Sequence, residues 1–150
     1  MGNRNSLIFN SDFELSLRML LILYNNRYKS LNCTEIVSYD ILTIYGQNYN
    51  LSENNLNGNN PYSYLEYLNR QLDSEKTIKK LIIKGYVKIN YSNKGYTYSI
   101  TDEGATFVES LESQYATEYL EINKLILNKY KNISDYDFDK ILTNINNEEA

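Results

Sequence analysis

The sequence predicts a mainly α-helical α+β fold that carries one small β-hairpin. Three observations predict it. Apolar residues recur at helical spacing through most of the 150-residue chain. One stretch, residues 87–100, instead alternates apolar and polar residues on both sides of a glycine-containing turn, as a hairpin does. The order of three helices, a hairpin and a further helix then points to a winged helix-turn-helix-like domain, followed by C-terminal helices.

Composition limits the class of protein. With 42% hydrophobic and 23% charged residues, the chain suits one compact domain. No intramolecular disulfide can form, because Cys33 is the single cysteine, and no apolar run is long enough to span a membrane. We therefore expect a cytoplasmic protein with no membrane contact. The absence of histidine excludes Ser-His and Cys-His pairs and histidine metal sites, so we expect no enzyme, no catalytic residue, no cofactor and no metal.

The first two helices have clear local signals. One is expected over residues 12–24, capped by Asp12, and Met19, Ile22 and Leu23 make its last two turns apolar on nearly all sides. This pattern predicts a helix at the centre of the core. A second helix is expected over residues 33–45, with the capping-box pair Asn32 and Glu35 and with Cys33 on its apolar side. We interpret that thiol as a buried structural cysteine.

The middle of the chain predicts a loop and a third helical segment. Seven of the fifteen residues at 46–60 are Asn, which indicates a long loop. Two apolar sets follow within residues 65–84, namely Leu65, Leu68 and Leu72, then Ile78, Leu81 and Ile82. Asp73 and Ser74 lie between the sets and resemble a helix start, so the segment is either one helix or two. Gly85 is placed to end it.

The rest of the chain predicts the hairpin and three more helices. A turn at 92–95 joins the two alternating strands. A helix capped by Thr101 is expected to reach Leu111, and a long amphipathic helix follows over 115–130. Ser134 caps a last helix with apolar spacing. We divide the chain into a winged-helix-like domain over 1–112 and a C-terminal helical extension over 113–150 packed on it.

Charge is distributed unevenly, and the positive part falls on the third helical segment. Residues 70–94 hold seven basic and two acidic side chains, a balance of +5 within a chain of net charge -4. On a helical wheel of about 100° per residue, four lysines share one side, opposite the buried set that begins with Ile78. Ile83 lies within this basic stripe. The candidate contact residues are Arg70, Lys76, Lys79, Lys80, Ile83, Lys84, Lys88 and Lys94.

This basic surface has three interpretations that the sequence leaves open. It is a solvated lysine face, a contact for an acidic partner protein, or a phosphate contact with nucleic acid. The face lacks Arg, Asn and Gln, the side chains that form bidentate contacts with bases, so any DNA contact is expected to be independent of sequence. An exposed β-branched residue such as Ile83 suits a protein contact better than a phosphate contact.

Several short motifs follow one another along the chain: LSLRMLL at 15–21, Tyr39-Asp40-Ile41-Leu42, Pro61-Tyr62, Arg70, LESQYA at 111–116 and Ser134-Asp135. In their order and spacing, from about Phe9 to Leu142, they resemble the ABC-three-component (ABC-3C) system middle component 2 proteins of bacteria, which are related to the small subunit of Lamassu anti-phage defence systems. Ser63 departs from the pattern, because a basic residue is expected after Pro-Tyr.

The resemblance implies an accessory subunit that joins an SMC/Rad50-like ABC ATPase to an effector protein, often a nuclease, in defence against phage or plasmids. ATP hydrolysis and cleavage then belong to the other two chains. The sequence has no Gly-rich Lys-Ser/Thr phosphate loop, which agrees with that division. We therefore predict a non-catalytic adaptor subunit. The alternative is a free-standing winged-helix DNA-binding transcription regulator, which usually needs Arg or Asn at base-contacting positions.

Overall fold

The computed structural model describes residues 12–45, 63–93, 95–130 and 140–141. Over these residues the chain is mainly helical and carries one two-stranded antiparallel sheet, which confirms the predicted class. The elements are α2 (Asp12–Asn25), α3 (Cys33–Ile44), α4 (Ser63–Ile83), β1 (Val87–Ser92), β2 (Gly95–Ile100), α5 (Asp102–Glu109) and α6 (Gln114–Tyr130). The predicted loop at 46–60 and nearly all of the predicted last helix lie outside the described residues.

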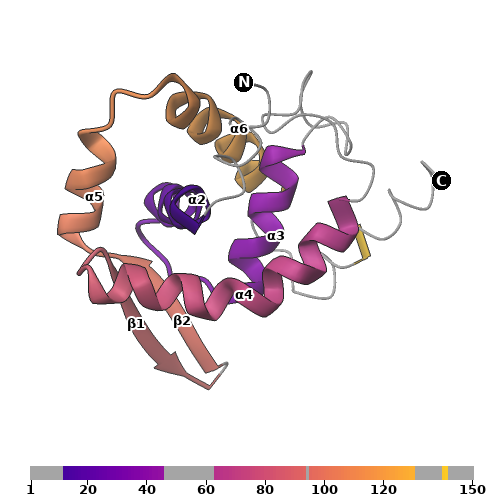
Figure 1. The fold of residues 1–150 in the computed structure, drawn as a ribbon, viewed down its shortest axis with the longest axis horizontal. Helices are drawn as coiled ribbons and strands as arrows, with labels where there is room; N and C mark the ends of the chain where they lie inside the picture. Colours follow the sequence, from indigo (N-terminus) through magenta and orange to yellow (C-terminus); the bar gives the residue numbers. More distant parts are fainter. Residues whose placement is uncertain (1–11, 46–62, 94, 131–139, 142–150) are drawn as a thin grey trace.

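Helix α2 lies at the centre, with α3, α4, α5 and α6 around it (Figure 1). Its last turns are apolar on nearly all sides and Met19, Ile22 and Leu23 are at most 1% exposed, as the sequence predicts. Burying each such side chain contributes about 1.5–3 kcal/mol. The first turn differs, because Phe13 is 67% exposed. Asp12, predicted as the cap, is the first residue of α2, and its carboxylate pairs with a lysine of α4.

Helix α3 begins at the predicted capping box. The Glu35 N–H donates to Asn32 Oδ1 at 2.8 Å, and the Asn32 N–H donates to Glu35 Oε1 at 3.0 Å. These two bonds satisfy donors that a helix start otherwise leaves unpaired. Cys33 is half-buried, and burial raises the pKa of its thiol. A structural role for this cysteine fits that environment better than a reactive one.

Helix α4 is one continuous helix, so the alternative of a second start at Asp73 and Ser74 is wrong. The physical reason is that Ser74 is 1% exposed and its hydroxyl donates to the Gln71 carbonyl at 2.9 Å, within the helix. The helix ends at Gly85 as predicted. This glycine has φ 80°, and its N–H donates to the Ile82 carbonyl at 3.0 Å, a common way to close a helix.

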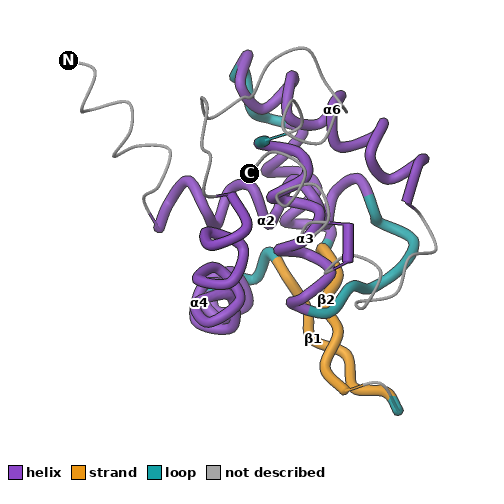
Figure 2. The backbone as a smooth tube through the Cα atoms, turned by 90° about the vertical axis from the view of Figure 1, so that its right-hand side faces the viewer, coloured by secondary structure: helices purple, strands orange, loops and turns teal. Residues whose placement is uncertain are grey.

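Strands β1 and β2 form a hairpin in which Val87 pairs with Ile100 and Ser92 pairs with Gly95. The hairpin projects from the helices (Figure 2). Only the base of β1 is covered, because Val87 is its single buried residue. Leu31 forms an isolated bridge with Tyr98, through hydrogen bonds of 2.9 and 2.8 Å. The turn that precedes α3 is therefore tied to β2.

Helices α5 and α6 complete the fold. The Thr101 hydroxyl accepts a hydrogen bond from the Gly104 N–H at 3.1 Å and caps α5, which ends at Glu109, two residues before its predicted end. Helix α6 packs on α2 and α3 and buries Tyr119 and other residues at helical spacing. The domain boundary at residue 112 stays a prediction. Within the described residues, no helix combines the length and the apolar character needed to cross a membrane.

Candidate functional site

The predicted lysine face lies on the outer side of α4. Lys76, Lys79, Lys80 and Lys84 are all exposed, and Ile78 on the opposite side is 1% exposed. Helical geometry explains this division, because residues three or four apart share a face. Among the described residues, one ion pair involves this face: Lys80 Nζ lies 3.2 Å from a carboxylate oxygen at the start of α2.

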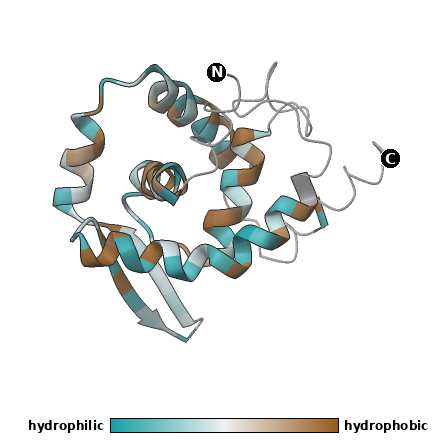
Figure 3. Ribbon diagram, in the orientation of Figure 1, coloured by the Kyte–Doolittle hydropathy of each residue, from teal (hydrophilic) through white to brown (hydrophobic). Residues whose placement is uncertain are grey.

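Four aliphatic side chains share that side of α4. Leu65 is 56% exposed, Leu68 40%, Leu72 83% and Ile83 84%. The sequence predicted the exposure of Ile83. The three leucines contribute to the apolar pattern that predicted the helix, but Tyr67, at 2%, is buried in their place. Brown hydrophobic positions alternate with teal hydrophilic ones along α4 (Figure 3).

We call this surface the α4 outer face and define it by six residues: Leu65, Leu68, Leu72, Lys76, Lys79 and Ile83. On the helical wheel they fall within a sector of roughly 80° that continues through the whole helix. The sequence held a signal for the exposure of the three leucines, since their wheel positions lie about 80° or more from those of Ile78 and Leu81. The face combines aliphatic groups with positive charge.

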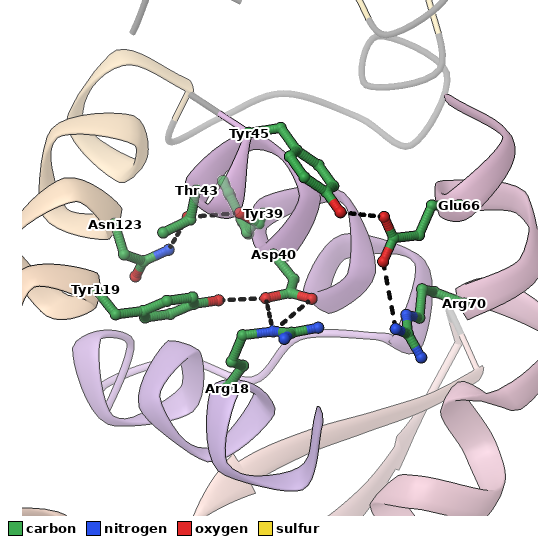
Figure 4. A network of polar contacts seen from close by, with 9 residues as sticks. All are labelled: Arg18, Tyr39, Asp40, Thr43, Tyr45, Glu66, Arg70, Tyr119 and Asn123. Carbon is green, nitrogen blue, oxygen red and sulfur yellow. Dashed lines mark hydrogen bonds and ion pairs between the residues drawn. The ribbon is translucent and has the colours of Figure 1, made fainter. Parts of the chain in front are cut away.

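Arg70 does not join the α4 outer face. Its Nη2 lies 3.3 Å from Glu66 Oε1, four residues earlier, and both side chains are only about 15% exposed. The hydroxyl of Tyr45, the residue that follows α3, donates to the same Glu66 carboxylate (Figure 4). Arg70 therefore helps to fasten α4 to α3, where its guanidinium has an acidic partner.

Lys88 lies in a second basic region. Together with Arg27, Lys29 and Asn90 it lines a polar hollow of about 300 Å³ between the turn after α2 and the outer side of the hairpin. The Arg27 guanidinium lies 4.1 Å from the centre of the Tyr24 ring. The residues that line this hollow include none of the lysines of α4. Lys94 lies outside the described residues.

A buried ionic network joins three helices at the centre of the fold. Arg18 Nε of α2 lies 2.9 Å from Asp40 Oδ1 of α3, and the two side chains are 0% and 2% exposed. The Tyr119 hydroxyl of α6 donates to the same Oδ1 at 2.6 Å (Figure 4). Burial is the largest influence on Arg18 and opposes its charge, but the Asp40 carboxylate and the neighbouring tyrosines together outweigh burial and raise the Arg18 pKa. Burial, and then Asp40, also raise the pKa of Tyr119.

Neutral polar groups continue this network. Asn123 Nδ2 of α6 donates to Thr43 Oγ1 at 3.1 Å, and Asn25 Nδ2 of α2 donates to Asn123 Oδ1 at 2.9 Å. The Thr43 hydroxyl donates in turn to the Tyr39 carbonyl at 2.6 Å. The first two bonds join α6 to α3 and α2 to α6, and the third lies within α3. The network therefore specifies how α2, α3 and α6 pack.

Sequence reasoning from spacing missed the buried network. The signal was present, because Arg18 interrupts the most apolar stretch of α2 and Asp40 interrupts that of α3. Opposite charges at such positions indicate a buried pair, since an unpaired buried charge is strongly unfavourable. Both residues occur in the motifs that carry the family resemblance. They lie in the core and support the fold, so the α4 outer face remains the candidate for contact with a partner.

These features define a class of protein: a small, mainly helical domain with a hairpin, a polar network in its core and an aliphatic and basic helix face at its surface. The chain belongs to the family of ABC-three component (ABC-3C) system Middle Component 2, whose model matches residues 8–149. It is therefore a component of an ABC-three-component system and works with the other components of that system. No curated protein and no solved structure matches the chain.

Proposed function

We propose that this chain is the non-catalytic adaptor subunit of a bacterial three-component defence complex against phage or plasmids. In this complex it links an SMC-like ABC ATPase to an effector, often a nuclease, and it acts in the cytoplasm. The ATPase and the effector perform hydrolysis and cleavage. The observation that carries the proposal is the family match over residues 8–149, because a middle component works with other components. We also propose that the chain is related to the small subunit of Lamassu systems.

We also propose that the helices α2, α3 and α4 and the hairpin form a winged helix-turn-helix arrangement, with the hairpin as the wing. The element order and the bridge between Leu31 and Tyr98 support this. Any contact of this arrangement with DNA occurs through the assembled complex and is independent of sequence, because α4 exposes no arginine that could form bidentate contacts with bases.

Co-expression tests the adaptor. The tagged chain is expressed with the ATPase and the effector encoded beside its gene, and each chain is also expressed alone. We expect both partners to co-purify with the tagged chain, and ATP hydrolysis to occur in fractions that contain the ATPase but not in the chain alone. Failure of association at micromolar concentration, with all three proteins folded, would overturn the proposal.

The second candidate is a free-standing winged-helix transcription regulator, which the lysines of α4 next to a hairpin favour. Titration of several duplexes of different sequence at two salt concentrations separates the two functions. The adaptor predicts weak binding by the isolated chain, equal for all duplexes and strongly reduced by salt. Nanomolar preference for one duplex at physiological salt would establish the regulator instead.

A further inference from the structure

The α4 outer face leaves large aliphatic side chains exposed in one line. Single exposed aliphatic residues are normal on a protein surface. Here Leu65, Leu68, Leu72 and Ile83 are 40–84% exposed and lie on one side of one 21-residue helix. From the first to the last they extend over roughly 27 Å, at about 1.5 Å per residue. A line of this length matches the contact that a second helix makes.

The spacing along this face is that of helix packing. Successive members of the face are three or four residues apart, from Leu65 through Lys76 to Ile83. Amphipathic helices dock on such rows, with their side chains between those of the row. Lys76 and Lys79 in the middle do not interrupt it, because the apolar stems of lysines cover neighbouring apolar surface while the ammonium groups stay in water.

Charge indicates the chemistry of the occupant. Two ammonium groups lie in the row itself, and Lys80 and Lys84 border it. These charges attract an acidic partner. A nucleic acid backbone would satisfy the lysines but would offer no apolar counterpart to Leu72 and Ile83, which are more than 80% exposed. A protein helix that carries both apolar and acidic residues satisfies the whole face.

We propose that the α4 outer face is the docking site for an amphipathic helix of another chain of the complex. Apolar residues of that helix contact Leu65, Leu68, Leu72 and Ile83, and its Asp or Glu residues lie opposite Lys76 and Lys79. This inference deepens the proposed function and rests on it, since it assigns the surface by which the adaptor holds a partner. Phe13 lies beside Lys80 and Lys84 in a neighbouring hollow and extends the apolar surface at that end.

The test compares matched single substitutions in the co-expressed complex. Leu72→Asp places a carboxylate in the row. Because it lies four residues before Lys76, the two side chains can pair on the helix surface, which helps to keep α4 helical. Leu125→Asp is the control, because Leu125 is 62% exposed on α6, away from the α4 outer face. We expect Leu72→Asp to reduce the co-purified partner at least about tenfold and Leu125→Asp to leave it unchanged. Circular dichroism of each isolated chain checks that it is folded.

A second comparison tests the charges. Lys76→Glu combined with Lys79→Glu is expected to weaken association about tenfold or more at low salt, and to remove most of its dependence on salt. Lys124→Glu combined with Lys129→Glu, on α6, is the charge-matched control and should have no such effect. If the two double variants change partner binding equally, the docking site is elsewhere and the inference is overturned.

The remaining outcomes separate this inference from the proposed function. If the unaltered chain binds no partner, both are overturned. If the unaltered chain binds its partner and Leu72→Asp binds it equally well, only the docking site is overturned. If light scattering shows a dimer of the isolated chain that Leu72→Asp separates, the occupant is a second copy and the inference is wrong. If the Leu72→Asp complex assembles but loses duplex DNA, the face serves nucleic acid and the inference is equally wrong.

Discussion

Replacing Asp40 by alanine is expected to unfold a large fraction of the molecules. The substitution leaves the Arg18 guanidinium, 0% exposed, without the carboxylate that lies 2.9 Å from its Nε. Removing one partner of a buried ion pair costs about 3–5 kcal/mol. The Tyr119 hydroxyl also loses its acceptor at 2.6 Å, which adds about 1–3 kcal/mol. The loss is comparable with the whole stability of a small domain, about 5–15 kcal/mol.

Urea unfolding followed by circular dichroism measures this loss. The combined variant Arg18→Met with Asp40→Leu removes both charges and is expected to recover most of the stability, since apolar groups of similar size replace buried pairs at little cost. Lys80→Ala is the matched control for an exposed pair. Its partner Asp12 is 78% exposed at the side chain, so the loss should be at most about 1 kcal/mol.

One result would refute the reasoning about the buried pair. If Asp40→Ala and Lys80→Ala lower the free energy of unfolding by amounts within about 1 kcal/mol of each other, burial does not strengthen the dependence of Arg18 on its partner. A combined variant no more stable than Asp40→Ala would also contradict it, because the cost would then arise from altered packing and not from the lost contact between Arg18 and Asp40.

Three further predictions concern local features. Gly104→Ala should lower the free energy of unfolding by about 1–3 kcal/mol and with it the melting temperature, because the alanine Cβ would lie 2.3 Å from the Tyr86 carbonyl oxygen. This loss outweighs the usual preference of alanine for helices. An unchanged melting temperature would contradict the tight packing of α5. Asn32→Ala should cost about 1 kcal/mol in urea unfolding through loss of the capping box, and Asn32→Ser should restore most of it. Burial raises the pKa of Tyr39 and of Tyr98 from 10.0 to about 12, so the unfolded chain releases these protons first and stability should fall as the pH rises from about 10 to 12. Unfolding curves across that range test it, and Tyr39→Phe should flatten the fall.

The helices and the hairpin were predictable because their signals are local. The capping box at Asn32 and Glu35, the glycine with positive φ at the end of α4 and the alternation in β1 each involve residues close in sequence. The central place of α2 was predictable from its composition, because a helix whose last turns are apolar on nearly all sides needs cover there from several neighbours.

The parts that escaped prediction depend on distant residues. Leu72 and Tyr67 are both suitable for a core, and only the position of α3 and α2 decides that Tyr67 is buried. Likewise, the bond between Tyr119 and Asp40 joins residues 79 apart. In the candidate site, the exposure of the lysines of α4 followed from the helical wheel, whereas the position of Arg70 depended on its contact with Glu66 and on the neighbouring α3.

The late position of α6 in the chain has a consequence for synthesis on the ribosome. Tyr119 and Asn123 reach residues of α3 that were made 79 and 80 residues earlier. At the usual pace of about 5–20 residues per second, α2 and α3 wait roughly 4–16 s for the helix that completes their polar contacts. During this interval the apolar helices α2 and α3 have an uncovered side. A message truncated before α6 should therefore yield a chain that needs a chaperone or aggregates.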